Sequence, residues 1–162
     1  MVCAQHNQDW SVMTIPQEVL DQPTRDFDGG EETTAWRARY RTAHQALMTH
    51  LRALPSAVFT KDSTPDWVGD PNVITSFEEN EIRVPSFQLG TDGSPIELVQ
   101  AVNFRLALRY RDGSVPWASP RIAQFVWWLK THQELGVAPI ELLGTDRESQ
   151  LIDLATDPAT LR

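Results

Sequence analysis

Histidine and cysteine are the side chains best suited to hold a metal ion, and this sequence has one cysteine and four histidines. They are Cys3, His6, His44, His50 and His132. Two ligands on one helical face are usually four residues apart, whereas His44 and His50 are six apart. Cys3 and His6 are three residues apart, but no third ligand accompanies them. We therefore expect no metal site, and a partly buried polar role for His44.

Paired carboxylates are the other groups that could support catalysis. Asp26 with Asp28 and Glu78 with Glu79 lie in turn-like sequence, where water is expected to surround them. General acid–base catalysis instead requires carboxylates whose surroundings separate their pKa values. The sequence also lacks a nucleophile elbow, a phosphate-binding loop and a dinucleotide fingerprint. These observations predict a protein without catalytic residues or a cofactor, and therefore not an enzyme.

Length and composition are those of one globular domain, or of one domain with an extension. Of the 162 residues, 41% are apolar and 22% are charged, and the net charge is −8. An acidic total disfavours nucleic acid as a partner, because phosphates attract positive surfaces. The sequence has no apolar run long enough for a membrane helix and no signal-peptide pattern at its start. We expect a cytoplasmic protein that makes no contact with a membrane.

An amphipathic helix is predicted in the first half of the chain, from Thr33 or Thr34 to a stop at Pro55. One face of this helix carries apolar side chains at spacings of three or four residues. These residues are Trp36, Tyr40, Ala43, Leu47, Leu51 and Leu54. The regular stripe predicts that this helix packs on the rest of the protein.

The arginines of the same helix suggest the main alternative function, a DNA-binding regulator. Arg37, Arg39 and Arg41 could contact phosphates together with His44. A helix-turn-helix, however, needs a second short helix after a tight turn. A segment rich in proline and aspartate follows the first helix instead. A solvated helix face is therefore favoured over a phosphate contact.

Loops and extended segments are expected on either side of this helix. Residues 1–30 are polar and aperiodic and predict a mobile arm, in which 10–15 form a short strand or a docked segment. Residues 55–82 predict a long acidic loop rich in proline, with one helical turn at most, at 71–77. Residues 82–89 resemble a strand that ends before the turn at 91–94.

The second half of the chain predicts helices that begin near Pro95 and Pro120, with shorter ones at 140–143 and 149–155. The expected fold class is therefore mainly α, a small helical bundle with a short strand or hairpin element near 82–89. Besides the stripe of the first helix, the predicted core consists of Phe87, Val99, Val102, Leu106, Phe125, Leu129, Leu142, Leu143, Leu151 and Leu154.

Two adjacent tryptophans, Trp127 and Trp128, fall in the helix that begins near Pro120. Neighbouring side chains on a helix point about 100° apart, so the two rings cannot both fill one core contact. We expect one ring in the core and the other partly exposed, where tryptophan often supports an interface. The alternative is that the N-terminal helix or arm covers both.

Several short motifs follow one another in a characteristic order between residues 77 and 157. They are Arg-Val-Pro-Ser-Phe-Gln-Leu at 83–89, Pro116-Trp117, Trp128-Leu129, Leu135-Gly136, Pro139, Leu142-Leu143 and the apolar residues of 151–155. In this order they resemble the toxin-binding domain at the C-terminus of Xre/MbcA/ParS-type antitoxins. Such antitoxins usually carry an N-terminal helix-turn-helix, for which residues 1–76 show no pattern.

The resemblance implies a non-catalytic protein that binds and silences a RES-domain toxin, an enzyme that consumes NAD. The resemblance covers a toxin-binding domain (77–157), which follows the flexible arm (1–30) and the amphipathic helix with an acidic loop (31–76) that the sequence pattern predicts. It also suggests a homo-oligomer, since such antitoxins commonly dimerise. By analogy, the chain's C-terminal end would face the toxin, with Arg162 near a site for an anionic phosphate ligand. The residues expected to bind the partner are Trp128, Pro139, Glu141, Leu142, Leu143, Arg147, Leu151 and Arg162.

Overall fold

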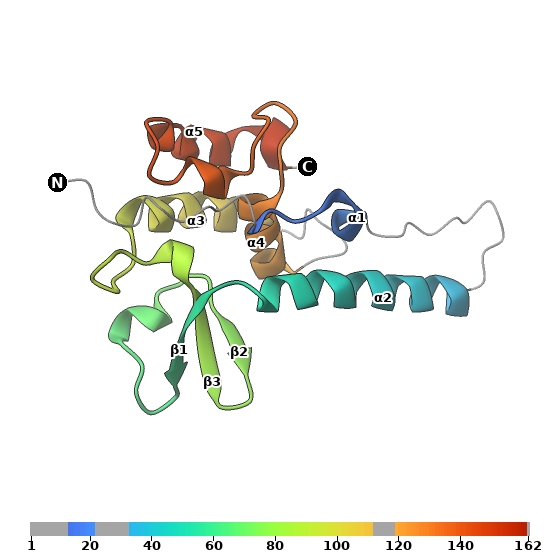
Figure 1. Ribbon diagram of the computed structural model, residues 1–162, viewed down its shortest axis with the longest axis horizontal. Helices are drawn as coiled ribbons and strands as arrows, with labels where there is room; N and C mark the ends of the chain where they lie inside the picture. The colour runs from blue at the N-terminus through green and yellow to red at the C-terminus, as the bar shows by residue number, and fades with distance from the viewer. Residues whose placement is uncertain (1–12, 22–32, 112–118, 162) are drawn as a thin grey trace.

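The fold combines helices with a small antiparallel sheet and belongs to the α+β class (Figure 1). The computed structural model of the protein describes residues 13–21, 33–111 and 119–161. The expectation of a mainly α bundle with one short strand or hairpin element is wrong, because the chain between 56 and 85 supplies three paired strands. In chain order the main elements are α1 (Gln17–Leu20), α2 (Thr33–Arg52), β1 (Ser56–Thr60), β2 (Ser76–Glu78), β3 (Glu81–Pro85), α3 (Glu97–Tyr110), α4 (Pro120–Leu129) and α5 (Leu151–Thr156).

The sheet has the strand order β1-β3-β2, so β3 is central and β1 and β2 are its edges. Strand β1 occupies the start of the segment expected to be a loop. Its sequence, Ser-Ala-Val-Phe-Thr, is short but rich in residues that favour strands. Strand β3 confirms the extended segment predicted from 82, but it ends at Pro85 and continues as a 3₁₀ turn, Ser86–Gln88.

A two-residue turn joins β2 to β3 and places two glutamates opposite each other, Glu78 and Glu81. Like charges in such a pair repel and destabilise a hairpin. Two arginines offset this repulsion. The Nε of Arg52, at the end of α2, lies 3.5 Å from Glu78 Oε1, and the Nε of Arg83 lies 3.7 Å from Glu81 Oε2.

One face of the sheet is covered by the chain between β1 and β2. That segment includes a 3₁₀ turn, Asp66–Gly69, whose Trp67 meets Phe59 of β1 edge-to-face with ring centroids 5.6 Å apart. Beneath it, Val73 and Val84 form the centre of a small second core. The acidic segment is therefore an ordered cover for the sheet rather than a long loop.

The main core lies between α3, α4, α5 and the last turns of α2. Most of the core residues predicted from 87 onwards are buried, as expected, while Leu143 and Leu154 are partly buried against the same cluster. Each fully buried side chain of this size contributes roughly 1.5–3 kcal/mol. The cluster also contains Leu47, Leu54 and Ile15, so it joins all three predicted parts of the chain.

Helix α2 confirms the predicted amphipathic helix and its stop before Pro55. Leu47 and Leu54 are buried, whereas most side chains of the first half of the helix are exposed. In Figure 1 this half extends sideways from the rest of the molecule. Only the C-terminal half of α2 is therefore anchored in the core.

Part of the expected mobile arm, residues 13–21, is docked on the helices. The Ile15 N–H donates to the Leu129 carbonyl at 2.9 Å, and the Ile15 side chain is buried. His50 of α2 lies with Nε2 3.1 Å from the Met13 carbonyl oxygen. Trp10 and the rest of the arm lie outside the described residues.

Candidate functional site

The residues expected to bind a partner divide into two groups in the structure. Half of them are buried core side chains that cannot contact a partner, and these are Trp128, Pro139, Leu142 and Leu151. Their role is to hold the C-terminal segment together. Arg162 lies outside the described residues.

The three remaining residues, Glu141, Leu143 and Arg147, are partly exposed. Glu141 serves the fold, because its Oε2 accepts a 2.8 Å hydrogen bond from the Ala138 N–H at the start of the turn Pro139–Leu142. Leu143 packs one side against the core. Arg147 follows a turn stabilised by Thr145, whose Oγ1 accepts from the Arg147 N–H at 3.2 Å. Leu143 and Arg147 therefore form the predicted surface that remains available to a partner.

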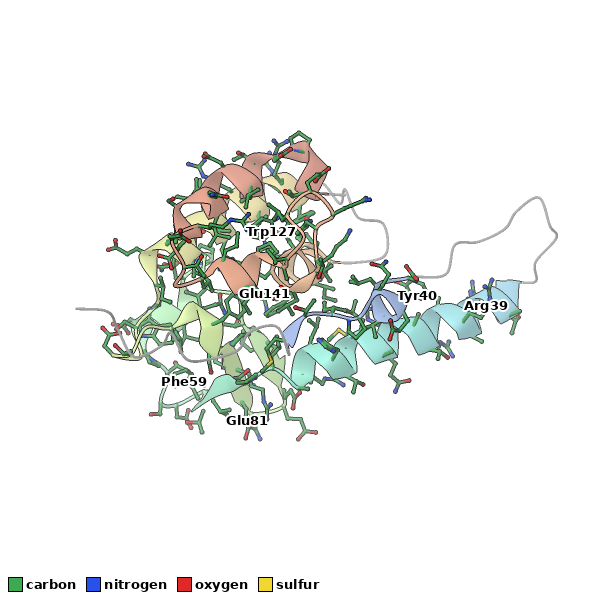
Figure 2. The ribbon with its side chains drawn as sticks, turned by 45° about the horizontal axis from the view of Figure 1, so that its top comes forward. Arg39, Tyr40, Phe59, Glu81, Trp127 and Glu141 are labelled. Carbon is green, nitrogen blue, oxygen red and sulfur yellow. The ribbon has the colours of Figure 1, made fainter. Side chains whose placement is uncertain are left out.

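The expectation that one of the two adjacent tryptophans is partly exposed is wrong, because Trp127 and Trp128 are both buried. Their exposed fractions are 1% and 0%. Every side chain of α4 from 123 to 129 is buried, so this part of the helix is surrounded on all sides. Figure 2 shows Trp127 enclosed by neighbouring side chains. In the described ranges the polar partners of the two indole rings come from α3 and from the C-terminal segment.

A buried network of polar side chains connects α4 to the sheet. The Trp128 Nε1–H donates to Asn103 Oδ1 at 2.8 Å. Asn103 Nδ2 in turn donates to the Asn72 carbonyl at 2.8 Å and to Gln88 Oε1 at 3.0 Å. Gln88 closes the network by bonding both backbone groups of Ile74, at 2.8 and 2.7 Å. The network fixes the chain that leads into β2.

The sequence pattern did not predict this network, although the sequence contains two signals of it. Asn103 is a polar residue within the apolar pattern of α3, and Gln88 follows the buried Phe87. Buried polar side chains of this kind are almost always hydrogen-bonded. Each of these two polar side chains therefore predicts a hydrogen-bonding group beside it, but the sequence does not identify that group.

The C-terminal end of the described chain is anchored on the other tryptophan. The Trp127 Nε1–H donates to Thr160 Oγ1 at 3.3 Å, and this hydroxyl donates to backbone carbonyls near the end of α5. Trp127 also packs against His132, with ring centroids 5.8 Å apart. The His132 Nε2 lies 3.1 Å from the Trp127 carbonyl oxygen. These contacts hold the end of the chain against α4.

Burial perturbs two titratable groups in this part of the protein. Desolvation lowers the pKa of His132 below its ordinary value of 6.5, although the hydrogen bond to the Trp127 carbonyl opposes this effect. Burial therefore favours the neutral imidazole over the charged form. Burial also raises the pKa of Tyr110, at the end of α3, to about 12.

A cleft lies on the opposite face of the sheet from Trp67, between the end of α2 and the start of α4. Its volume is about 310 Å³, within the range of ligand-binding pockets. The apolar part of its wall comes from α2, the sheet and α4. It consists of Met48, Leu51, Phe77, Pro85, Ile122 and Phe125. Nothing in the sequence pattern identified this cleft, because it depends on the sheet.

Three arginines and one glutamate also line the cleft: Arg52, Arg83, Arg121 and Glu78. Arg121 donates from Nη1 to the Thr75 carbonyl at 2.9 Å, and its guanidinium carbon lies 5.5 Å from the centre of the Phe77 ring. A cation over an aromatic face is attracted to it. The cleft is thus apolar inside with positive charge at its edge, in a chain whose net charge is −8.

Arg37, Arg39 and Arg41 are exposed on the protruding half of α2, and Figure 2 shows Arg39 there, far from Trp127. The chain after α2 passes directly into β1, so a second helix does not follow as a helix-turn-helix requires. His44 is partly buried, as predicted, and stacks on Tyr40 with ring centroids 5.9 Å apart.

Metal-binding clusters and membrane spans are both absent from the described part of the chain. In residues 13–21, 33–111 and 119–161 no group of three or more His, Cys, Asp or Glu side chains is arranged to hold a metal ion. No helix within those ranges is long and apolar enough to cross a membrane.

Comparison with known proteins identifies no relative. Neither a family model, nor a curated protein, nor a solved structure matches the chain. Its function must therefore be argued from its own residues and from the motif resemblance.

Proposed function

We propose that this protein is a non-catalytic, antitoxin-like binding protein that neutralises a RES-domain, NAD-consuming toxin. The partner would contact the surface around Leu143 and Arg147 and the chain beyond it. The motif residues that carry the resemblance would form the core of the domain, and the partly exposed residues beside them would contact the toxin.

The observation that supports this proposal most strongly is that several motif residues far apart in the sequence pack together within the described ranges, which do not include Pro116 and Trp117. Phe87 contacts Trp128, with ring centroids 5.3 Å apart, and Gln88 joins the same tryptophan through Asn103. Leu142 belongs to the same core. Motifs that meet in one core are expected of a shared domain, whereas chance matches need not meet.

The test is a pull-down of the tagged full-length chain from its native cells, with wild type compared with Arg147→Glu. Removing residues 139–162 would be a poor control, because it deletes core side chains such as Ile140 and Leu151. Arg105→Glu is better matched, since Arg105 is an exposed arginine on α3. We expect a RES-domain protein to co-purify with wild type and Arg105→Glu, and at least tenfold less with Arg147→Glu. Recovery of no RES-domain protein would count against the proposal.

The second candidate function, DNA binding through α2, draws on the exposed arginines of its protruding half. Binding to phosphates would weaken steeply with salt, by about one power of salt concentration for each phosphate contacted. Fluorescence anisotropy with a labelled DNA duplex at rising salt distinguishes the two functions. Arg37→Gln with Arg41→Gln would abolish DNA binding, whereas the proposed toxin contact would be unchanged.

A further inference from the structure

The cleft beside α4 has features that the proposed toxin contact does not use. Phe77 is 61% exposed at its edge, although an aromatic ring of this size is usually covered. The neighbouring wall is apolar, and it is formed by side chains such as Leu51, Ile122 and Phe125. A volume of about 310 Å³ accommodates a large aliphatic or aromatic side chain.

Arg121 supplies positive charge at the same edge. One of its N–H groups is used by the Thr75 carbonyl, and the Phe77 ring supports the guanidinium. Within the described ranges no carboxylate lies within ion-pair distance of Arg121, whereas Arg52 and Arg83 each have a glutamate partner. A guanidinium carries five N–H donors and suits a carboxylate in two-pronged geometry. Arg121 is therefore able to receive an acid from outside this part of the chain.

Within the described ranges, the strand beside the cleft also has one edge that is not paired with another strand. Strand β2 is the last strand of the sheet on that side. Glu78 and Glu81 flank a two-residue turn and so form a hydrogen-bonded pair, which directs the backbone N–H and C=O of Phe77 away from β3. An edge of this kind can pair with an added strand.

We propose that this cleft binds an extended segment of a protein partner, which adds to the edge of β2. The segment places one large apolar side chain in the cleft and a nearby carboxylate against Arg121. Ser76 pairs with Arg83, so a residue that adds opposite Ser76 faces the cleft side of the sheet. The partner need not be the toxin, and the site is separate from Leu143 and Arg147.

An extended peptide accounts for more of these features than a small molecule does. A small amphipathic carboxylate would fill the cleft and pair with Arg121, but it would leave the strand edge unused. A peptide engages the cleft, the cation and the edge together, and covers more of Phe77. The backbone pairing is thus the feature that separates the two occupants.

The experiment uses a library of random decapeptides displayed on phage and selected on the full-length chain. The double variant Phe77→Ser/Arg121→Gln serves for counter-selection. We expect enriched sequences to carry a large apolar residue within two positions of Asp or Glu. A fluorescein-labelled copy of the most enriched peptide should lose at least tenfold in affinity for Arg121→Gln and for Phe77→Ser.

Matched variants and modified peptides make the test specific. Phe104→Ser and Arg105→Gln alter similarly exposed residues on α3 and should leave affinity unchanged. Phe77→Ser removes an exposed ring, so it remains informative even if Arg121→Gln unfolds the protein. N-methylation of the peptide at successive positions should weaken binding at alternate residues, the signature of strand addition.

Three results would overturn the proposal: no enrichment, equal binding to the double variant, or uniform effects of N-methylation. The last result would indicate an occupant that does not pair with β2. Toxin neutralisation is measured separately on the same variants. A failure of the cleft to bind peptide is thereby distinguished from a failure of the proposed antitoxin function.

Discussion

Trp128 and Asn103 are joined by a 2.8 Å hydrogen bond inside the protein, and both side chains have an exposed fraction of 0%. The bond links α4 to α3, and through Asn103 it reaches Gln88 and the chain that leads into β2. The helical core and the sheet are therefore connected by polar contacts as well as by apolar packing. The cleft opens beside this connection and is lined by residues of β2 and of the start of α4.

The substitution Asn103→Leu tests this network. It leaves the Trp128 N–H without its partner in a buried site and the Asn72 carbonyl without this partner in a partly buried one, and an unsatisfied buried group costs about 1–3 kcal/mol. We expect the free energy of unfolding to fall by roughly 3 kcal/mol in urea denaturation. Gln45→Leu, an amide-to-leucine change on the exposed side of α2, should change it by less than about 0.5 kcal/mol. Equal effects of the two substitutions would contradict a structural role for the network.

Stability should depend on pH through His132. Burial holds its native-state pKa below 6.5, so the unfolded chain binds a proton at a higher pH than the native protein does. The free energy of unfolding therefore decreases as the pH falls below 6.5, and this contribution levels off below the native pKa. His132→Gln, which can still donate to the Trp127 carbonyl, should remove this part of the slope. Parallel pH profiles for the two proteins, measured by urea denaturation, would show that His132 does not contribute.

The hydrogen bond between Trp127 and Thr160 should anchor the C-terminal end. Thr160→Val keeps the shape of the side chain but leaves the indole N–H unpaired, at a cost of about 1–2 kcal/mol. We expect faster hydrogen exchange of the backbone amides at Asp157 and Thr160. Thr91→Val, at an exposed turn, is the control. Unchanged exchange in Thr160→Val would mean that other contacts hold this end.

The turn between β2 and β3 contains Glu79, with φ of 25°, where a side chain is unfavourable. Glu79→Gly should stabilise the protein by about 1 kcal/mol, because glycine adopts positive φ without steric cost. Glu79→Ala removes the same charge and keeps the backbone strain. A thermal melt in which alanine stabilises as much as glycine would attribute the gain to charge instead.

Helical periodicity predicted α2, α3 and α4 well, because each has a long apolar pattern and a proline near its start or stop, whereas the four-residue α1 was not predicted. The stripe that ends at Leu54 and the helix that begins at Pro120 are examples. The strands were harder, since β1 and β2 have five and three residues and lie among prolines and aspartates. Such short segments acquire their structure from pairing with β3, which local sequence does not report.

The candidate sites were predictable to different degrees. The resemblance placed the partner-binding site in the C-terminal segment. The residues predicted from it included core residues such as Leu151 together with partly exposed residues such as Arg147. A motif does not distinguish residues that specify a fold from those that meet a partner. The cleft could not be predicted, because Leu51, Phe77 and Ile122 come together only through the sheet.

The most direct test of the central claim is the rate of NAD consumption by the RES-domain protein from the same cells. The purified enzyme is assayed with increasing amounts of the full-length chain, of Arg147→Glu and of Arg105→Glu. We predict that wild type and Arg105→Glu suppress NAD consumption near equimolar ratio, and that Arg147→Glu requires at least tenfold more protein. An unchanged rate in the presence of excess wild-type chain would contradict the proposed function.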